Sequence, residues 1–266
     1  MNAATEGFSL QGRSALVIGG GSGIGREIAL GYRRAGAKVL LAGRRAERLL
    51  AVAEELRAAA GPADGSAGDG PRLAYPADAR ASGALAELAA TVAADHGTPD
   101  ILVNCQGTTA IKPALELSEA EYDTILDTNL KSVFFACTAF APGMLARGDG
   151  RIVNITSLAA HTGWANAAAY SASKWGVAGI TQSLAAEWGE GGVRVNAIAP
   201  GFFMTELNRE RMPEARKAEA RRRSAMRRMG ELSELVGAAI FLASDAAAFV
   251  NGATLRVDGG YLASGI

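Results

Sequence analysis

Short apolar runs alternate with helical patterns along almost the whole chain, and this alternation restricts the fold more than any other feature of the sequence. Each run carries few polar positions, which is typical of parallel strands that are buried on both faces. The runs lie at residues 14–18, 38–42, 72–75, 100–104, 151–155, 193–198 and 254–257. Strands separated by helices at this spacing predict an α/β fold with a doubly wound, mainly parallel sheet and helices on both faces.

The segments between the strands have helical patterns, with one exception. Helices are predicted at residues 26–36, 46–59, 82–96, 118–145, 167–188, 205–229 and 233–243. Ser118 and Glu121 form a capping-box pattern, which marks the start of the long helix at 118–145. Residues 61–71 are instead rich in Gly, Pro and Asp, and we expect a mobile loop there. No repeat or linker divides the chain, so a single domain over residues 1–266 is predicted.

The composition fits a globular protein with a substantial core and argues against several classes of function. Hydrophobic residues make up 49% of the 266 residues, and Lys+Arg equal Asp+Glu at 27 each. With no charge bias, we expect neither a nucleic-acid partner nor a membrane surface. The sequence has no apolar run of membrane-spanning length and no apolar leader, which favours the cytoplasm. Cys105 and Cys137 lie in apolar segments without a CxxC pattern, so we expect buried thiols and no metal site.

A glycine cluster follows the first predicted strand and leads into the first helix. A strand–glycine–helix arrangement presents backbone N–H groups and a helix N-terminus to a pyrophosphate. The spacing Gly19-x3-Gly23-x-Gly25 does not match the G-x-G-x-x-G pattern, and a plain tight turn is the alternative. The position after the first buried strand nevertheless favours a dinucleotide site in a Rossmann-type fold. The residues expected to bind the cofactor here are Gly19, Gly21, Ser22, Gly23, Ile24 and Gly25.

The residues after the second strand indicate which dinucleotide binds. NAD-specific sites carry an acidic residue at this place, which accepts hydrogen bonds from the ribose 2′-OH. This chain has Gly43-Arg44-Arg45 instead, and a guanidinium can pair with a 2′-phosphate. NADP(H) is therefore favoured as the cofactor, with NAD(H) as the alternative. Arg44 and Arg45 are also compatible with solvated charges at the start of a helix.

Tyr170 and Lys174 lie four residues apart in the predicted helix at 167–188, so their side chains project from one face. An ammonium beside a phenol lowers the pKa of the phenol and suits the pair to acid–base chemistry. Ser157, at the end of the preceding strand, can supply a hydroxyl to the same place. Taken alone, such a Tyr–Lys pair is ordinary helix surface, and it gains meaning only from the rest of the chain.

Together these motifs resemble those of the short-chain dehydrogenase/reductase family over residues 10–260. The shared positions occur in the family's order and spacing: the glycine loop, Asp78, Asn104, Asn129, Ser157, Tyr170, Lys174 and Pro200-Gly201. The resemblance implies an NAD(P)-dependent oxidoreductase that transfers a hydride between the cofactor and a CH–OH group.

The resemblance also implies a role for each matching residue. Tyr170 would be the general acid/base, Lys174 would lower its pKa and hold the nicotinamide ribose, and Ser157 would bind the substrate oxygen. Asn129 would sustain a proton relay through water to Lys174. The remaining positions would line the cofactor cleft: Asp78 at the adenine ring, Ala79, Asn104 and Gly107 beside it, and Pro200, Gly201, Phe203 and Thr205 over the nicotinamide carboxamide.

Two places depart from the family pattern. Ile18 stands where the family has Thr, and Asn104-Cys105-Gln106-Gly107 replaces Asn-Asn-Ala-Gly. Both places support the cofactor cleft. We therefore expect a hydrogen bond between the glycine loop and the fourth strand to be missing, which would weaken cofactor binding.

The substrate is expected to be a small and anionic molecule. The predicted lid at 200–230 contains more basic than acidic residues, although most of them are expected to be solvated. The sequences of residues 200–208 and 257–266 resemble those of the gluconate 5-dehydrogenase-like branch of the family. This resemblance implies a sugar acid such as gluconate or 5-ketogluconate as the substrate. A 3-oxoacyl-[acyl-carrier-protein] reductase is the alternative, because a phosphopantetheine arm is anionic too. A non-catalytic nucleotide sensor is disfavoured, because the catalytic positions are all retained.

Three further residues complete the expected substrate pocket. His161, Trp164 and Asn166 lie between Ser157 and Tyr170, where the family lines the pocket, although a Trp is as often a packing residue. The resemblance also implies a homo-oligomer, a tetramer assembled through the long helices.

Overall fold

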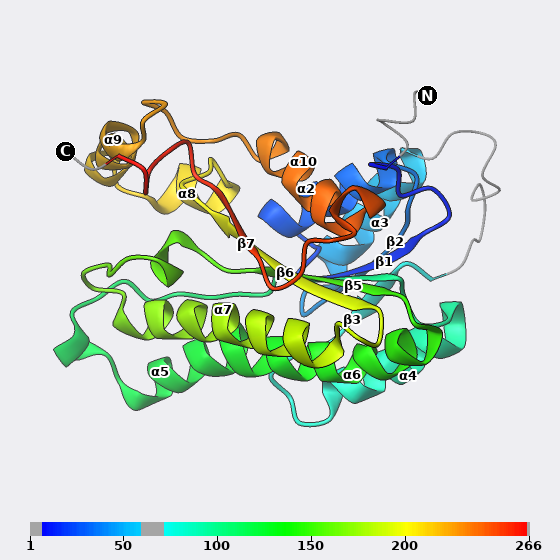
Figure 1. The fold of residues 1–266 in the computed structure, drawn as a ribbon. Coiled ribbons are helices and arrows are strands. Elements are labelled where there is room, and N and C mark those ends of the chain that lie inside the picture. Colours follow the sequence, from blue (N-terminus) through cyan, green and yellow to red (C-terminus); the bar gives the residue numbers. More distant parts are fainter. Residues whose placement is uncertain (1–6, 60–71, 265–266) are drawn as a thin grey trace.

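A seven-stranded parallel sheet forms the centre of the molecule in the computed structural model, which describes residues 7–59 and 72–264 (Figure 1). The strand order is β3-β2-β1-β4-β5-β6-β7, and the predicted fold class is confirmed. The strands are β1 (Ser14–Ile18), β2 (Lys38–Gly43), β3 (Ala74–Pro76), β4 (Ile101–Asn104), β5 (Gly150–Ile155), β6 (Val193–Pro200) and β7 (Thr254–Val257). The loop predicted at 61–71 lies outside the described residues.

The helices lie close to their predicted positions. The α-helices are α2 (Gly23–Arg34), α3 (Ala46–Ala58), α4 (Ala84–His96), α5 (Glu119–Leu126), α6 (Ser132–Arg147), α7 (Ala168–Trp188), α8 (Glu206–Arg211), α9 (Glu214–Arg223) and α10 (Ser233–Ala243). Short 3-10 turns lie at η1 (Ala114–Glu116), η3 (Leu158–Ala160) and η4 (Asp245–Ala247). Among the described residues, no helix combines the length and apolar character that a membrane span requires.

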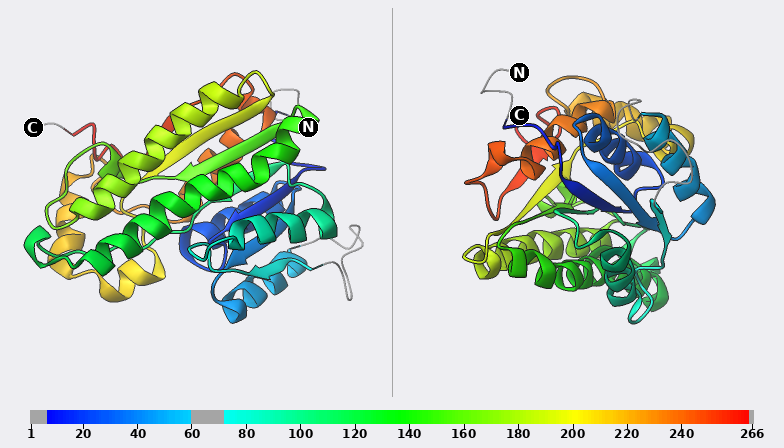
Figure 2. Two further views of the ribbon diagram at one scale, coloured as in Figure 1. Left: turned by 90° about the horizontal axis from the view of Figure 1, so that it is seen from below. Right: turned by 90° about the vertical axis from the view of Figure 1, so that its right-hand side faces the viewer.

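Two layers of helices cover the sheet, one on each face (Figure 2). Side chains alternate along each strand, so Ala15 and Val17 of β1 face one layer while Leu16 and Ile18 face the other. The first layer contains α2, α3 and α10, and the second contains α4, α6 and α7. Because both faces are covered, the strands are apolar throughout, which explains the continuous apolar runs of the sequence.

The strand order reverses between β1 and β4, and this reversal creates the place for a site. From β1 the chain builds outward through β2 and β3, and then returns to add β4 on the other side of β1. The connections after β1 and β4 therefore leave in opposite directions, and a crevice opens at the carboxyl ends of these strands. Ile18 and Asn104 are paired in register at this point, so the glycine loop and the loop after β4 begin side by side.

The long helix predicted at 118–145 is interrupted. The capping box is present, with the Ser118 hydroxyl accepting from the Glu121 amide at 3.3 Å. After α5, however, residues Asp127–Lys131 form a π-helical turn, η2, before α6 begins. The amide of Ser132 accordingly reaches back five residues to the carbonyl of Asp127. The prediction of one continuous helix is wrong here, because an inserted residue changes the hydrogen-bond register without disturbing the apolar pattern.

The segment predicted to be helical over 205–229 contains two short helices. Pro213 separates α8 from α9, because proline cannot donate the backbone hydrogen bond that would join them. Both helices lie beyond the carboxyl end of β6, on the side of the sheet edge where the catalytic positions are expected (Figure 1).

Candidate active site

Residues that are distant in sequence meet at the carboxyl edge of β4 and β5. Ser157 follows β5, and Tyr170 and Lys174 lie in the first turns of α7. The Lys174 ammonium donates to the carbonyl of Ile155, the last residue of β5, at 2.9 Å. Lys174 and Ser157 are both buried, at 4% and 6% exposure, whereas Tyr170 is half-buried. The expected grouping of Ser157, Tyr170 and Lys174 is thus observed.

The electrostatics of this group differ from the expectation. Burial raises the pKa of the Tyr170 phenol above its usual 10, and a hydrogen bond with Ser157 only partly opposes that rise. The Lys174 nitrogen lies 5.9 Å from the centroid of the Tyr170 ring. Burial lowers the pKa of Lys174 itself to about 8. The Tyr170 pKa is therefore shifted upward in this structure, opposite to the expected direction, and burial is the main cause.

Asn129 lies at the centre of the π-helical turn and fixes two neighbouring segments. Its Oδ1 accepts from the amide of Thr108 at 2.7 Å, and its Nδ2 donates to the Thr108 carbonyl at 2.9 Å. The same Nδ2 also donates to the Ser173 hydroxyl at 3.0 Å, and Ser173 in turn donates to the carbonyl of Tyr170. Asn129 is fully buried, so it holds the loop after β4 against the catalytic helix α7.

The glycine loop has the shape that a pyrophosphate requires. Gly19 has a φ of +86°, and a Cβ there would lie 2.8 Å from the backbone of Cys105. A side chain at Gly25 would collide with the carbonyl oxygen of Gly19, whereas the space beside Gly23 is open. Ser22 precedes α2 in an extended conformation without capping it, and no acidic residue lies in the first turn. The first amides of α2 and its positive dipole end can therefore bind an anion.

Basic side chains surround the end of this cleft. The Arg45 guanidinium donates to the Ser22 hydroxyl at 3.0 Å, which places a cation directly beside the glycine loop. Arg44 is exposed and close enough to Asp78 to help lower the pKa of that carboxyl, although the hydrogen bond from Arg80 is the larger cause. The residues present therefore fit a dinucleotide, and their charge suits one with an additional phosphate.

Four of the expected cofactor residues pack wholly or partly into the protein interior. Asn104 is fully buried and donates to Asn154 at 2.9 Å, so its side chain does not reach the cleft. Ile24 and Phe203 pack in the layer of α2, α3 and α10, and Ala79 packs in the layer of α4, α6 and α7. Ile24 and Ala79 stay partly exposed, whereas Phe203 is buried, and the role of these three in cofactor binding stays a prediction.

The remaining cofactor positions are tightly placed. A Cβ at Gly107 would lie 3.5 Å from Asn129 Oδ1 and 3.7 Å from Lys174 Nζ, so this glycine borders the catalytic group. Gly201, after Pro200 at the end of β6, donates to the Val257 carbonyl at 2.8 Å. Thr205 caps α8, with its hydroxyl accepting from the Asn208 amide at 3.0 Å.

The three expected substrate residues occupy different surroundings. His161 lies at the surface, but the partial burial of its ring and the charge of Arg256 lower its pKa, against the opposing charge of Asp258. Trp164 stacks on Phe202 with ring centroids 5.3 Å apart, which supports the packing alternative for this residue. Asn166 is exposed and has a φ of +63°, a left-handed conformation that asparagine tolerates better than most residues.

The two departures from the family pattern have modest consequences at the backbone. The amide of Cys105 donates to the carbonyl of Ile18 at 2.9 Å, so β1 and the end of β4 stay joined by the main chain. Burial raises the pKa of the Cys105 thiol to about 12, with Lys174 opposing the shift, so Cys105 is not a nucleophile at neutral pH.

Several residues of the site could not be found from motifs. Thr108 and Ser173 bind Asn129, and Arg80 binds Asp78, at 2.7 Å between Arg80 Nη2 and Asp78 Oδ2. Arg48 of α3 lies beside Gly21 and forms an ion pair with Glu206 of α8 at 3.1 Å. Of these residues, only Arg48 could have been proposed from the sequence, because it lies in the first turn of the helix that follows the cofactor end of β2.

Comparisons with known proteins agree with this geometry. The family model described as enoyl-(acyl carrier protein) reductase matches residues 19–262. A D-threitol dehydrogenase from Mycolicibacterium smegmatis is 42% identical over 254 residues, covering 96% of this chain and 94% of that protein. The chain belongs to the short-chain dehydrogenase/reductase family.

Further relatives place the chain within that family. A gluconate 5-dehydrogenase from Gluconobacter oxydans is 37% identical over 263 residues, with 97% of both chains covered. The crystal structure of a gluconate 5-dehydrogenase from Burkholderia cenocepacia in complex with NADP and tartrate superposes with a TM-score of 0.89 at 35% identity, covering 98% of this chain and all of that one. The predicted likeness to the gluconate 5-dehydrogenase-like branch is confirmed. The protein is thus an oxidoreductase that acts on secondary alcohols, and the prediction of an enzyme is confirmed.

Proposed function

We propose that this protein uses NADP(H) to interconvert a hydroxyl and a ketone of a sugar acid of the gluconate class. The arrangement of Ser157, Tyr170, Lys174 and Asn129 beside the glycine loop carries this proposal. The named relatives act on sugar acids and on D-threitol, a neutral polyol, so the branch favours polyhydroxylated substrates. The bound NADP and tartrate of the Burkholderia cenocepacia enzyme support both parts of the proposal.

The residues of this chain supply position and proton transfer. When bound, the cofactor supplies or accepts the hydride at the reacting carbon. Ser157 donates a hydrogen bond to the substrate oxygen, and the neighbouring Tyr170 hydroxyl gives that oxygen a proton in reduction or removes one in oxidation. In reduction Lys174, held by the Ile155 carbonyl, replaces the proton that Tyr170 loses, and in oxidation the same transfers run in reverse. Asn129 keeps Thr108 and α7 together so that this path is maintained.

A free cation near the substrate residues favours an anionic substrate. Leu255 and Val257 of β7 pack toward the layer of α2 and α10, so Arg256 between them faces the side of α7. Arg256 has no acidic partner within ion-pair distance among the described residues, and its charge helps lower the pKa of His161. It also lines a cleft of about 360 Å³ together with Phe202, which stacks on Trp164. We assign Arg256 the role of pairing with the carboxylate of the sugar acid.

The basic lid contributes less to this recognition than its composition indicates. Arg222 pairs with Glu219 at 2.7 Å, and Lys217 pairs with Glu214 at 2.8 Å. Arg228 is likewise paired with Glu234 at 2.5 Å. These three pairs reduce the net positive charge that the lid offers to an acyl-carrier protein, which supports the sugar acid over the 3-oxoacyl thioester.

The experiment that tests the proposal measures NADPH- and NADH-linked turnover on a panel of substrates. The panel contains gluconate and 5-ketogluconate, a neutral polyol with its ketose, and a 3-oxoacyl thioester. We expect the highest kcat/KM with the sugar acid and NADP(H). Preference for the thioester would replace the proposed substrate class, and absence of turnover with every member would overturn the proposed function.

Arg256→Gln separates the anionic from the neutral substrate. We expect KM for the sugar acid to rise about tenfold, because a charge-assisted hydrogen bond is lost, while KM for the polyol changes less than about twofold. The control is Arg216→Gln, an arginine at the start of α9 outside the cleft lining. An equal rise of KM for both substrates would contradict the assignment.

Arg45→Ser tests the choice of cofactor. Loss of the guanidinium beside Ser22 should lower the NADPH/NADH ratio of kcat/KM about 10- to 100-fold, the value of a charged hydrogen bond. Arg57→Ser, on the same helix but paired with Glu54 at 2.6 Å, is the matched control. An unchanged ratio in Arg45→Ser would contradict the assignment of NADP(H) through this arginine.

The assembly is proposed separately. Large apolar side chains stay exposed on the helices at one face of the molecule, at Tyr122, Phe134, Phe135 and Trp175. We propose that these faces pair in a homotetramer, and light scattering of the purified protein would measure its mass directly.

A further inference from the structure

Gln106 occupies a position where its side chain joins two parts of the active site. It lies two residues beyond β4, and its Nε2 donates to the Ser132 hydroxyl at 3.1 Å, with a weaker contact to Asn104 Oδ1 at 3.5 Å. Its Oε1 is buried and has no hydrogen-bond partner in the part of the chain that the structure describes. A buried amide with one unpaired atom is costly, so the orientation of this side chain is imposed by its other contacts.

The contact of Gln106 falls on the residue that closes the π-helical turn. Ser132 is 1% exposed, and its amide reaches Asp127 instead of the Thr128 carbonyl that a regular α-helix would use. The Ser132 hydroxyl donates to that Thr128 carbonyl at 2.7 Å. The hydroxyl therefore replaces the backbone bond that the π-turn displaces, and Gln106 fixes the hydroxyl by donating to its oxygen.

The next residues of the same loop make a second contact with the same turn. Thr108 exchanges two hydrogen bonds with Asn129, at 2.7 and 2.9 Å. Gly107 lies between these two contacts and borders both Asn129 and Lys174. The loop after β4 is thus clamped to the π-turn at two points, one on each side of the glycine that faces the catalytic lysine.

We propose that Gln106 is a positioning residue for catalysis, which holds the π-turn in the register that places Asn129 against Thr108 and α7. This inference rests on the proposed oxidoreductase function, because it assigns Gln106 no chemistry of its own. Gln106 acts through Ser132 on the position of Asn129, and so on the alignment of Lys174 and Tyr170.

A purely structural role is the competing explanation, because Gln106 also touches a buried polar chain that leads away from the site. Asn104 donates to Asn154 at 2.9 Å, and Asn154 donates to the Thr181 hydroxyl at 3.0 Å. Thr181 is fully buried, two turns beyond Lys174, and its hydroxyl also donates to the Val177 carbonyl at 2.8 Å. Neither of these two hydrogen bonds reaches the loop after β4 or the π-turn, so Thr181 provides a control for the loss of buried hydrogen bonds outside the clamp.

The experiment compares Gln106→Met, Ser132→Ala, their double variant and Thr181→Val. Methionine keeps the length of the glutamine while removing its donor. Since small displacements of catalytic groups reduce rates about 10- to 100-fold, we expect kcat of Gln106→Met to fall by that factor with KM changed less than about threefold. Thr181→Val should lose thermal stability and keep kcat. The double variant should be no slower than Ser132→Ala, because both substitutions break the same hydrogen bond between Gln106 and Ser132.

Two kinetic outcomes would overturn the proposal. One is a Gln106→Met enzyme that, like Thr181→Val, loses stability and keeps kcat; the other is a double variant in which the two losses of kcat multiply. Hydrogen exchange at the amides of Thr108 and residues 127–132 gives a readout that needs no turnover. If the wild-type protein turns over no substrate, the proposed function fails, and unchanged exchange in Gln106→Met would separately refute the clamp.

Discussion

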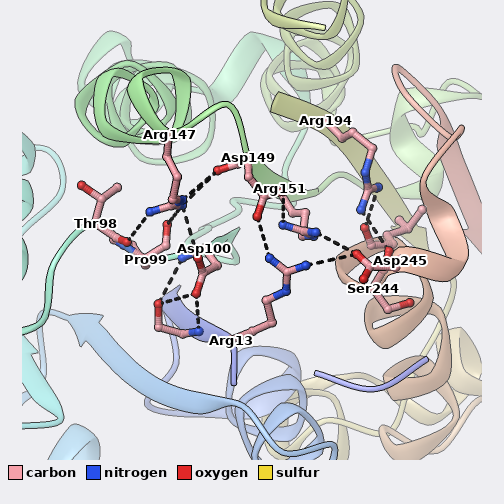
Figure 3. A network of polar contacts seen from close by, with 12 residues as sticks. Arg13, Thr98, Pro99, Asp100, Arg147, Asp149, Arg151, Arg194, Ser244 and Asp245 are labelled. Carbon is pink, nitrogen blue, oxygen red and sulfur yellow. Dashed lines mark hydrogen bonds and ion pairs between the residues drawn. The ribbon is translucent and has the colours of Figure 1, made fainter. Parts of the chain in front are cut away.

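Two buried cations at opposite edges of the sheet show how the surroundings of a charge decide what it can do. Arg151 of β5 is 5% exposed at the amino edge, and Lys174 of α7 is 4% exposed at the carboxyl edge. Arg151 lies 2.7 Å from Asp149 and 2.8 Å from Asp245 (Figure 3). Lys174 donates to the Ile155 carbonyl and has no carboxylate partner among the described residues. The two cations are equally buried, but only one of them is neutralised.

Their pKa values shift in opposite directions as a result. Burial opposes the charge of Arg151, but hydrogen bonds and attraction from Asp149 and Asp245 outweigh it, and its pKa is raised. For Lys174 burial prevails, and its pKa is lowered to about 8. A cation locked between carboxylates cannot exchange its proton, whereas a lysine with a pKa near neutrality can.

Two further arginines of the amino edge, Arg13 and Arg147, also pair with carboxylates. Arg13 contacts both Asp149 and Asp245, at 2.6 and 3.3 Å. Arg147 lies 3.4 Å from Asp100. Arg194 instead donates to two carbonyls at 3.0 Å, that of Leu242 in the last turn of α10 and that of Ser244, and burial lowers its pKa. The network joins the starts of β1, β4, β5 and β6 to η4 (Figure 3). The amino edge uses its charges for stability, and the carboxyl edge keeps one charge available for chemistry.

The largest effect that separates the two edges is expected for Tyr170→Phe. Removal of the phenolic hydroxyl takes away the acid/base, so kcat should fall about 10³-fold within the usual range of such catalysis, while the fold is kept. Tyr122→Phe, the same chemical change on α5, is the control; it keeps the aromatic ring at the proposed assembly face and should keep full activity. Retention of near-normal turnover by Tyr170→Phe would remove Tyr170 from its assigned role.

Arg151→Met should show the opposite profile at the amino edge. Breaking a buried ion pair costs about 3–5 kcal/mol, and we expect the low end, about 3 kcal/mol, because Asp245 is 64% exposed and can be hydrated. At urea concentrations below its lowered unfolding midpoint, the variant should keep kcat within about twofold of the wild-type value. Urea unfolding and turnover at 25 °C measure both quantities. A large loss of kcat in a stably folded Arg151→Met protein would show that the two edges are coupled.

Much of the fold and of the catalytic group could be predicted from the sequence, because these features depend on residues close together in the chain. Apolar runs and helical spacing determine which segments become strands and helices, so the sheet and the positions of Tyr170, Lys174 and Ser157 at its carboxyl edge could be predicted. The fixed spacing of Tyr170 and Lys174 within one helix needs no tertiary information. The glycine loop is similar, since its contacts with Cys105 follow from the pairing of β1 with β4.

The features that could not be predicted from the sequence depend on contacts between residues that lie far apart in the chain. Nothing local marks Asn129 as part of a π-turn, because the turn is stabilised by Ser132 and by the loop after β4. Asn104 was expected to face the cofactor but turns toward Asn154. The direction of the Tyr170 pKa shift was predicted wrongly because burial, unlike spacing, is a property of the whole fold.

Lys174→Met gives the smallest stability change and the sharpest test of the comparison. It should abolish most turnover, yet it removes an unpaired buried cation whose pKa is lowered from 10.5 to about 8. Each pKa unit corresponds to about 1.4 kcal/mol, and the lost bond to Ile155 offsets part of the gain, so the variant should be about 1–2 kcal/mol more stable at pH 7.

The pH dependence of that gain fixes its cause. Between pH 8 and 10.5 the unfolded wild type binds a proton at Lys174 that the folded protein has released, so wild-type stability rises with pH in this window relative to the variant. The advantage of Lys174→Met should therefore be full below pH 8 and disappear by about pH 10. Urea unfolding of both proteins at pH 7, 8.5 and 10 measures the difference. An advantage that stays constant with pH would show that packing, and not the uncompensated charge, separates Lys174 from Arg151.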